Sequence, residues 1–483
     1  MMPPADLLDA LLAGQIAAAL PTARWFAGKR SVIDRVTIHD RVALPGFDEV
    51  ALTLVDVVVE GSDVPHRYVA PVAANGGDAA SSAAFARWLL DSVVHERTLS
   101  GRSGGFVGHC ETAGLAVADG AMTVAPLGGD ASNSSFVVRC DSHAWAVKLF
   151  RRCRASIQPE VEIGRFFAQD SPWGSTPRLV GWLEYAVAET AVVTAGDVTP
   201  HAVTSTAIAT VHEFLPDCTT GWDRLVGLVL GDGRVSEQVL EIVAALGRLT
   251  GAMHRALAAR PDILAFAPEP ATAASRAATA ARMREHAAGV FSLIESRRFH
   301  CEPTIAGRLE AVLATRERLL ESFDQITSVA VPMSKIRVHG DYHLGQVLVQ
   351  DHGERVFVID FEGEPSRTLA ERREKTFAAK DVAGMCRSLD YLLRHVAKTT
   401  GRPYLIADLL RLETCYLDAY REVAAGQPWW PADRQAADSL LAAFKLDKSI
   451  YELAYELTYR PDWIDVPLAA VEEAAATGAP CRG

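Results

Sequence analysis

The sequence lacks the short signatures of several large protein classes. Its eight cysteines are scattered and include no Cys-x-x-Cys pair, which excludes the usual zinc-site spacing and a compact disulfide framework. No run of 18 uninterrupted apolar residues occurs, so we expect no membrane-spanning helix. A Walker loop and a Gly-x-Ser-x-Gly elbow are also missing. We therefore expect reduced thiols in a cytoplasmic protein.

The net charge of the chain argues against further classes of protein. The chain has 60 acidic and 48 basic residues and a net charge of −12, which argues against nucleic acid or an anionic membrane as a partner. Residues 1–10 carry two acidic residues and no basic one, unlike the start of a secretory signal. We expect small-molecule ligands and a monomeric chain.

The composition and the hydrophobic pattern of the 483-residue chain change twice along its length, which predicts three regions. Residues 1–110 read as a small α+β cap subdomain that ends in a Gly/Ser-rich linker over 100–108. Residues 111–216 are rich in strands, and residues 217–483 are mostly helical. In the cap we expect helices at 5–20 and 81–97 and strands at 35–44, 50–60 and 67–73. In the helical region we expect helices at 223–230, 236–259, 271–298, 303–326, 381–398, 404–424 and 435–459.

Residues 335–362 interrupt the helices and carry the strongest chemical pattern. The pattern predicts a strand, a loop with His339-Gly340-Asp341, a short strand, a polar turn at 351–354, and a strand that ends in Asp360-Phe361-Glu362. Two carboxylates are thus delivered at loop ends. Phosphoryl transfer needs such groups, because one carboxylate takes a hydroxyl proton and others hold magnesium.

Asp341 is the candidate catalytic base. The spacing of His339, Asp341 and Gln346 is close to the catalytic loop of kinases, with the usual final Asn replaced by Gln. Gln346, Asp360 and Glu362 offer the hard oxygen atoms that Mg²⁺ prefers. The alternative is an ordinary turn and a strand end, but two correctly spaced matches favour the catalytic interpretation.

Lys148 is the candidate partner of the nucleotide phosphates. It lies in a strand-like run well before Asp341, on the other side of the change in texture. Glu160 or Glu162 on the following helix could pair with this lysine and hold it, and we favour Glu162. A solvated helix face is the alternative for either glutamate.

Two further segments have the correct order for a nucleotide site. The loop 128–135 includes Ser132, Asn133 and Ser134, whose hydroxyl, amide and backbone groups could contact phosphates, although an ordinary polar hairpin is an equal alternative. Glu213, Phe214 and Leu215 end the strand-rich region and could form a hinge beside adenine. A plain connection between regions is the alternative there.

The loop His339 to Leu348 resembles the catalytic loop of actinobacterial maltokinases and their relatives. The match continues through residues 360–365, 369–373 and 381–385. It also includes residues 24–29, 147–152 and 446–463 and thus covers nearly the whole chain. The resemblance implies an α+β, bilobal protein-kinase-like fold of the aminoglycoside phosphotransferase type with an N-terminal α+β cap. It also implies the use of ATP and Mg²⁺ to phosphorylate a sugar hydroxyl.

Glucosamine kinases share this architecture, and three departures point to them. Tyr342 replaces the Leu usual in maltokinases, residues 374–380 replace an Asp-Ser-Pro-Leu-Arg type of segment, and residues 457–459 also differ. We therefore predict phosphorylation of glucosamine at its 6-hydroxyl. The alternatives are maltokinase activity, which makes maltose 1-phosphate, and a non-catalytic binding protein. A protein kinase is disfavoured because no Ala-Pro-Glu motif follows Asp360.

The C-terminal stretch is the predicted acceptor wall, with helical spacing that places several polar side chains along one element. Its carboxylates could bind sugar hydroxyls and the ammonium group of glucosamine, and Trp463 could stack on the sugar ring. His343, two residues after Asp341, is a further acceptor-site candidate. The predicted members of the wall are Asp447, Tyr451, Glu452, Glu456 and Trp463. An amphipathic packing helix is the alternative for this stretch.

Overall fold

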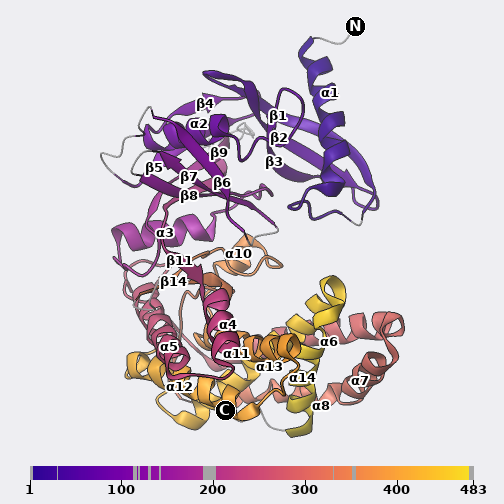
Figure 1. Cartoon of the computed structure of the whole chain (residues 1–483), viewed down its shortest axis with the longest axis vertical. Coiled ribbons are helices and arrows are strands. Elements are labelled where there is room, and N and C mark those ends of the chain that lie inside the picture. The colour runs from indigo at the N-terminus through magenta and orange to yellow at the C-terminus, as the bar shows by residue number, and fades with distance from the viewer. Residues whose placement is uncertain are drawn as a thin grey trace, which may run out of the picture. The chain divides into compact units, whose positions relative to one another are not determined.

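Figure 1 shows the computed structural model of the chain, with strands gathered in its N-terminal part and helices in its C-terminal part. The structure describes residues 4–29, 31–112, 117, 120–128, 132–140, 143–188, 203–329, 331–350 and 355–477. The chain divides into two compact units. The first comprises Met1–Asp170, Pro177–Leu215 and Thr368–Ala370, and the second comprises Ser171–Thr176, Pro216–Arg367 and Glu371–Gly483.

The first unit begins with the cap. Helix α1 (Pro4–Ala19) packs on an antiparallel sheet of the order β1-β2-β3, formed by β1 (Ile33–Leu44), β2 (Phe47–Val59) and β3 (His66–Ala73). Leu12, Ile16, Phe26 and Tyr68 belong to the buried cluster that joins the helix to the sheet. The predicted helix and three strands are thereby confirmed.

A second sheet of seven antiparallel strands follows, in the order β4-β5-β9-β10-β8-β7-β6. Its strands are β4 (Thr98–Ser100), β5 (Gly105–Cys110), β6 (Met122–Pro126), β7 (Ser134–Cys140), β8 (His143–Leu149), β9 (Leu179–Ala188) and β10 (Val203–Glu213). The predicted linker at 100–108 is wrong, because these residues form the end of β4, a turn and most of β5. Its glycines serve close packing instead: a Cβ on Gly108 would lie 1.9 Å from the Ser92 carbonyl oxygen of α2 (Ala83–Val94).

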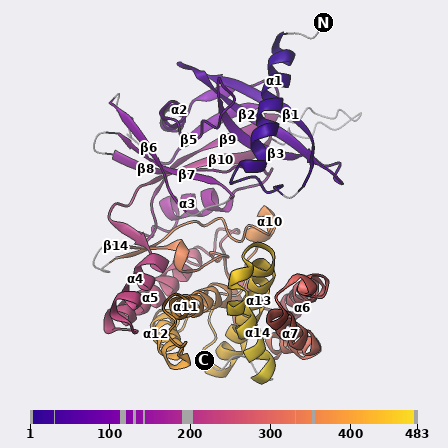
Figure 2. The same ribbon diagram turned by 45° about the vertical axis from the view of Figure 1, so that its right-hand side comes forward.

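The cap and the seven-stranded sheet share one hydrophobic core. Val42 and Leu54 of the cap strands, Phe85 of α2, and Val147 and Ile208 of the larger sheet all belong to the same buried cluster. Ser82 begins α2, since its hydroxyl accepts a hydrogen bond from the Phe85 backbone N–H at 3.1 Å. Figure 2 shows α2 beside strands of this unit and α3 (Pro159–Gln169) below them.

The second unit is mainly helical, and its helices agree with the predicted ones except for a break at Thr315 and for α14 (Asp465–Thr477), which the sequence analysis did not predict. Its longer helices are α4 (Gly221–Asp232), α5 (Glu237–Leu257), α6 (Ala273–Arg297), α7 (Pro303–Ala314), α11 (Ala379–Thr400), α12 (Ile406–Ala424), α13 (Arg434–Tyr459) and α14 (Asp465–Thr477). The helix predicted over 303–326 is broken at Thr315, and α8 (Arg316–Ser322) and α9 (Gln325–Ser328) follow. The Thr315 hydroxyl donates to the Val312 carbonyl at 2.8 Å, a local bond that competes with the helical pattern.

Short strands form part of the segment 334–358 of this unit. Strand β14 (Val347–Gln350) pairs with β11 (Cys218–Thr220) on one side and β15 (Val356–Val358) on the other, all antiparallel. A separate pair joins β12 (Glu269–Pro270) to β13 (Ser334–Lys335). The predicted polar turn at 351–354 lies outside the described residues.

The described part of the chain contains no helix that is both long and apolar enough to cross a bilayer. The cysteines that the structure describes at positions 110, 140, 153, 218, 301, 386 and 415 all carry free thiols.

Candidate active site

The segment 336–343 forms an irregular loop that enters the short helix η3 (Leu344–Gln346). The sequence predicts this loop but not the helix, and the strand expected before the loop is limited to β13 (Ser334–Lys335). Gly340 has φ +87°, a left-handed conformation that glycine adopts without a Cβ penalty. The turn at this glycine separates His339, which is buried, from Asp341, which is partly exposed. The loop therefore presents Asp341 at the surface of the unit while its flanks stay in the core.

Asp381, at the start of α11, fixes the backbone of this loop. Its carboxylate accepts hydrogen bonds from the backbone N–H of His339 at 2.8 Å and of Gly340 at 2.9 Å. His254 Nε2 lies 3.1 Å from the same carboxylate, and the side chains of both residues are fully buried. Burial by itself raises the pKa of Asp381, but the bond from His254 and the loop N–H groups lower it below its usual value. A buried, charged acceptor thus holds the loop.

Two more residues on the same face of α11 contact the loop. A Cβ on Gly384 would lie 2.4 Å from the Tyr342 carbonyl oxygen, so only glycine permits this approach. The Ser388 hydroxyl accepts a hydrogen bond from the Leu344 N–H at 3.1 Å. Asp381, Gly384 and Ser388 are spaced by three and four residues, which places them on one helix face. The loop is therefore fastened to α11 along its length.

His339 links the loop to the strand that leads to Asp360. Its Nε2 lies 2.9 Å from the Ile359 carbonyl oxygen, and its Nδ1 accepts a bond from the Asp341 N–H at 3.3 Å. This pairing assigns the proton to Nε2, because a carbonyl can only accept and a backbone N–H can only donate. His339 is 1% exposed and packs 5.0 Å from the ring of Phe361. We assign it to positioning the loop.

Asp341 is paired with Lys448 of α13. Asp341 Oδ1 lies 3.1 Å from Lys448 Nζ, and the side chains keep 19% and 24% of their exposure. Burial by itself raises the pKa of Asp341, but the positive charge of Lys448 outweighs that effect and holds the pKa far below its usual value. Asp341 is therefore ionised at neutral pH, the state in which it can accept a hydrogen bond from a hydroxyl.

The side chains predicted to bind metal lie together. Gln346 Nε2 donates to Asp360 Oδ2 at 2.9 Å, which leaves the Gln346 amide oxygen as the candidate ligand atom. Carboxylate oxygens of Asp360 and Glu362 lie within 4.8 Å of each other. Glu362 also pairs with the buried Arg372 at 3.3 Å. This oxygen-rich set fits Mg²⁺, which prefers hard ligands.

Asp360 has an unusual backbone. Its φ of +66° is in the left-handed region, where side chains other than glycine and asparagine are uncommon. Such a conformation costs free energy and persists where the surrounding structure enforces it, which is frequent at functional sites. The strain marks Asp360 as a residue whose side chain is needed in one direction.

In the first unit, Lys148 pairs with Glu160, and our preference for Glu162 was wrong. Lys148 Nζ lies 3.0 Å from Glu160 Oε2. Glu160 is in the first turn of α3 and only 6% exposed. Glu160 and Glu162 are two positions apart, so their side chains point about 200° apart around the helix axis. Only one of them can therefore face the strand that bears Lys148. The glutamate that meets the strand is Glu160.

The loop and hinge candidates also lie in the first unit. Ser134 is the first residue of β7, and its hydroxyl is bound by Arg151 Nε at 2.8 Å. Ser132 and Asn133 immediately precede that strand. Glu213 ends β10 and accepts hydrogen bonds from Arg178, while Phe214 packs beneath the guanidinium of Arg139 at 4.9 Å. Leu215 is the last residue of this part of the unit.

The acceptor wall divides into two groups, of which one lies near the candidate base. Asp447 Oδ1 is 2.9 Å from His286 Nδ1, and Tyr451 packs 4.7 Å from Lys448 Nζ. His343 caps η3, since its Nδ1 accepts from the Gly345 N–H at 3.0 Å, and burial lowers its pKa below the usual value. These three residues are neighbours of the Asp341–Lys448 pair in the chain or in space.

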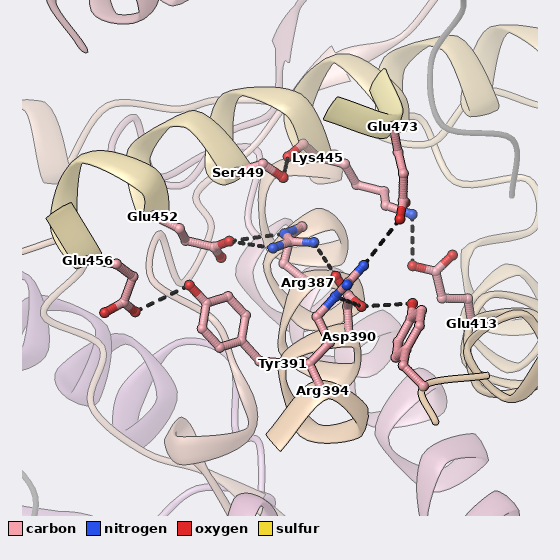
Figure 3. Close-up of polar contacts among 11 residues, drawn as sticks. Arg387, Asp390, Tyr391, Arg394, Glu413, Lys445, Ser449, Glu452, Glu456 and Glu473 are labelled. Atoms are coloured by element: carbon pink, nitrogen blue, oxygen red, sulfur yellow. Dashed lines mark hydrogen bonds and ion pairs between the residues drawn. The ribbon is translucent and has the colours of Figure 1, made fainter. Parts of the chain in front are cut away.

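The other group is committed to packing, which differs from our expectation of a wall open to a sugar. Figure 3 shows Glu452 and Glu456 directed toward α11. Glu452 Oε2 accepts from Arg387 Nε at 3.0 Å and Nη2 at 2.8 Å, and Glu456 accepts from Tyr391 at 3.2 Å and from Arg460. Glu456 is 1% exposed. Trp463 stacks on His395, with ring centroids 5.3 Å apart.

A cavity of about 100 Å³ opens beside the loop, and its lining is strongly charged. Gly340 and Gly363 are among its lining residues, and each is adjacent in the chain to a candidate site residue, Asp341 and Glu362. Carboxylates of Glu364 and Asp447 line it together with Arg367 and Lys380. A polar cavity of this kind suits a ligand that carries many hydroxyl groups.

Sequence reasoning missed the residues that hold the site in place. Lys448 and Asp381 each lie within a motif that carried the family resemblance, but neither received a role. The spacing of Asp381, Gly384 and Ser388 on a predicted helix was an available signal for a face that contacts something polar. His254, which the sequence analysis did not single out, is fully buried beside Asp381.

Comparison with known proteins matches two regions of the chain to known families. Residues 123–363 match the phosphotransferase enzyme family (APH), and residues 20–101 match the maltokinase N-terminal cap domain. A glucosamine kinase from Streptacidiphilus jiangxiensis is 34% identical over 267 residues, which cover 54% of this chain and 56% of that protein. A glucosamine kinase from Mycolicibacterium smegmatis is 31% identical over 278 residues, which cover 55% and 62%. The matched region thus spans little more than half of each relative.

Solved structures show the same fold over nearly the whole chain. A glucosamine kinase in crystal form B has a TM-score of 0.64 and 24% identity, and the match covers 96% of this chain and 99% of that one. A glucosamine kinase in complex with glucosamine, ADP and inorganic phosphate has a TM-score of 0.60 and 23% identity, with 95% and 98% covered.

The fold and the site define a kinase-like phosphotransferase architecture with mixed helices and sheets. Residues 123–363 of the chain match the phosphotransferase enzyme family, and its N-terminal region matches the maltokinase type of cap.

Proposed function

We propose that the protein is an ATP-dependent kinase that phosphorylates glucosamine to glucosamine 6-phosphate. The observation that supports the reaction class best is the ionised Asp341, presented by a loop that Asp381 fastens to α11. The sequence similarity to two glucosamine kinases supports the choice of sugar.

In this proposal the 6-hydroxyl of the sugar donates a hydrogen bond to Asp341 and attacks the γ-phosphorus of ATP. A new P–O bond forms at the sugar, the bond to the β-phosphate oxygen breaks, and ADP leaves. The hydroxyl proton passes to Asp341 and then to solvent. Because the transition state of phosphoryl transfer is loose, a weakly basic carboxylate is sufficient, and its main task is to orient the hydroxyl.

Other residues of the chain would support the nucleotide. Lys148, held by Glu160, would contact ATP phosphates, and Ser132, Asn133 and Ser134 would cover them. Residues 213–215 would offer backbone groups to adenine. Gln346 and Asp360, with Glu362, would hold Mg²⁺, which when bound neutralises the negative charge of the phosphates.

The acceptor would bind in the cavity beside Gly340. Asp447 and Glu364 can accept hydrogen bonds from sugar hydroxyls, and either carboxylate can pair with the ammonium group that distinguishes glucosamine from glucose. His343 and Tyr451, which lie near Asp341 and Lys448, complete the proposed acceptor site.

The test is ATP consumption by the intact chain with glucosamine, glucose, maltose and an aminoglycoside as acceptors. We expect glucosamine to be the best substrate by kcat/KM, and the product to carry phosphate at O6 by ³¹P–¹H correlation. Asp341→Asn should abolish turnover while nucleotide binding persists. Maltose as the only good acceptor would replace this proposal by the maltokinase alternative, for which the cap match alone is weak support.

A further inference from the structure

Two adjacent residues of α13 bring opposite charges to the proposed acceptor site. Asp447 lines the cavity beside Gly340, and the next residue, Lys448, has its ammonium group 3.1 Å from the Asp341 carboxylate. Successive residues of a helix point about 100° apart around its axis, so one charge can face the cavity while its neighbour faces the base. The candidate base is therefore accompanied by a positive charge, and the cavity by a negative one.

The positive charge of Lys448 is a permanent feature of this site. Burial by itself lowers the pKa of Lys448, but the nearby carboxylates, above all that of Asp341, outweigh that effect and hold the pKa well above its usual value. The ammonium group also lies 4.7 Å from the centroid of the Tyr451 ring, a cation–π contact. Glu364, which lines the cavity, is among the carboxylates that act on Lys448. A ligand in the cavity would therefore be exposed to the charge of Lys448.

Asp447 is the cavity carboxylate best suited to receive a cation. Its Oδ1 lies 2.9 Å from His286 Nδ1, and a histidine can donate this bond in its neutral form. Glu364, in contrast, already has two cationic partners, Arg367 at 3.5 Å and Lys380 at 3.6 Å. Because those cations would oppose a further positive charge, we assign the ammonium group of an aminosugar to Asp447.

The chemistry of glucosamine limits how it can lie between these two charges. Its ammonium group is on C2, and O1 and O3 are on the neighbouring carbons, whereas O6 extends from C5, the ring atom opposite C2. With O1 or O3 at Asp341, the ammonium group would lie beside Lys448, and like charges about 4 Å apart repel strongly in a partly buried site. With O6 at Asp341, the ammonium group is carried across the ring and away from Lys448.

We propose that Lys448 determines which hydroxyl group of an aminosugar is phosphorylated, by excluding the acceptor orientations that place an ammonium group next to the base. The class of acceptor that fits is a hexose whose positive charge is remote from the reacting hydroxyl. Lys448 is a specificity-determining residue in this arrangement, and Asp447 receives the ammonium group. The inference rests on the proposed kinase function and gives a physical reason for its preference for the 6-hydroxyl.

The experiment compares glucosamine, glucose and 4-amino-4-deoxyglucose as acceptors of the intact chain at neutral pH, where both aminosugars are mainly cationic. The 4-amino sugar carries its ammonium group on the carbon next to C5, so reaction at O6 brings that charge toward Lys448. We expect its kcat/KM to be at least about tenfold below that of glucose in the parental chain. In Lys448→Met this deficit should shrink to about threefold or less, because the repelling charge is gone.

The ratio of two acceptors separates specificity from a change in the base. Lys448→Met alters Asp341 for every acceptor alike, so this effect cancels in the ratio, and the ratio of glucosamine to glucose should change little. Lys448→Arg keeps the positive charge and should keep the parental deficit. Lys448→Gln offers an N–H group to Asp341 without the charge, and it decides the question if Lys448→Met does not fold.

Lys398→Met is the matched control for the loss of one positive charge. Lys398 is near the end of α11, and its ammonium group binds the Asp462 carbonyl oxygen instead of a group of the site. This variant changes the net charge of the chain by the same amount as Lys448→Met. It should leave the deficit of the 4-amino sugar at the parental value.

Several outcomes would overturn the inference. Equal use of 4-amino-4-deoxyglucose and glucose by the parental chain would do so, as would a deficit that persists in folded Lys448→Met or that disappears equally in Lys398→Met. A chain that rejects glucosamine but phosphorylates glucose, with the Lys448-dependent deficit of the 4-amino sugar, would contradict the proposed substrate and support this inference. A chain that phosphorylates none of the three sugars would overturn both.

Discussion

The carboxylate of Asp381 accepts a hydrogen bond from the backbone N–H of Gly340, 2.9 Å away, although the two residues are 41 positions apart. The same carboxylate receives the His339 N–H and the ring of His254. The position of Asp341 therefore depends on a side chain that cannot itself reach a substrate, because Asp381 is fully buried.

Asp381→Asn should separate positioning from folding. An asparagine offers one acceptor oxygen where the loop needs two, so one N–H is left unpaired, at a cost of about 1–3 kcal/mol in the free energy of unfolding. We expect kcat to fall at least tenfold with a smaller change in KM for ATP. Urea unfolding and steady-state kinetics measure the two effects. Ser388→Ala is the matched variant on the same helix face, and we expect it to lower the free energy of unfolding by about 1 kcal/mol. A fully active Asp381→Asn variant would contradict the positioning role.

Lys448→Met should change the dependence of activity on pH. Lys448 lowers the pKa of Asp341, whereas burial raises it. Removal of the ammonium group therefore raises that pKa, and protonation inactivates the base at higher pH than in the parent. We expect the acidic limb of the kcat profile to shift upward by at least one pH unit. Lys448→Arg keeps the charge and should retain the parental limb. Identical profiles for parent and Lys448→Met would show that the pair does not control ionisation.

Variants of Asp360 test whether its strained backbone costs stability and whether its carboxylate is needed for activity. Asp360→Gly removes the cost of φ +66° and should stabilise the fold by about 1 kcal/mol while abolishing activity. Asp360→Asn tolerates the same backbone but lacks the charge, so it should keep parental stability and need a much higher Mg²⁺ concentration for half-maximal rate. Thermal unfolding and magnesium titrations distinguish the two variants. Destabilisation by Asp360→Gly would show that side-chain contacts outweigh the backbone strain.

Asp447 and Glu452 should respond differently to loss of charge. Asp447→Asn removes a carboxylate from the cavity and should raise the KM for glucosamine about tenfold, as expected for one charged hydrogen bond. Glu452→Gln leaves Arg387 with less compensation and should destabilise the fold by about 3 kcal/mol, with an unchanged KM. Kinetics and urea unfolding of both variants test the assignment. A large KM effect of Glu452→Gln would restore its predicted place in the acceptor site.

Glu160 and Glu162 form another natural pair of variants. Glu160→Gln loses the ion pair with Lys148 and should raise the KM for ATP several-fold, because the lysine is no longer held. Glu162→Gln should have the smaller effect. The KM for ATP at saturating glucosamine measures both. The reverse order would favour the pairing that we expected from the sequence.

The fold was predictable where hydrophobic periodicity is long. The helices over 236–259 and 435–459 recur in the structure as α5 and α13, since apolar residues three and four positions apart define a buried face. The segment 100–108 was misread because glycine signals a flexible linker and a tightly packed strand equally well. The pairing of β5 with β4 and β9, and the lack of room for a Cβ at Gly108 beside the Ser92 carbonyl oxygen, identify a packed strand.

The candidate site was predictable where residues are close in the chain. Asp341, Gln346 and Asp360 form one strand–loop–strand unit, and their spacing suffices to group them. Glu452 was misjudged because a carboxylate on a helix looks the same whether it faces a sugar or an arginine. Its partner Arg387 is 65 residues away on α11, a pairing that spacing does not encode.

Helix α11 contacts both the loop that presents Asp341 and helix α13, and this matters for the engineering of substrate preference. Asp381, Gly384 and Ser388 contact the loop that presents Asp341, and Arg387, close to them on the same helix, pairs with Glu452 of α13 (Figure 3). The candidate base Asp341 and the helix that bears Asp447 are thus both positioned by α11. A library of variants restricted to cavity-lining positions such as Thr279, Glu364 and Asp447 would leave helix α11 unchanged. Its members should differ in the acceptor that they prefer and should keep the phosphoryl-transfer step.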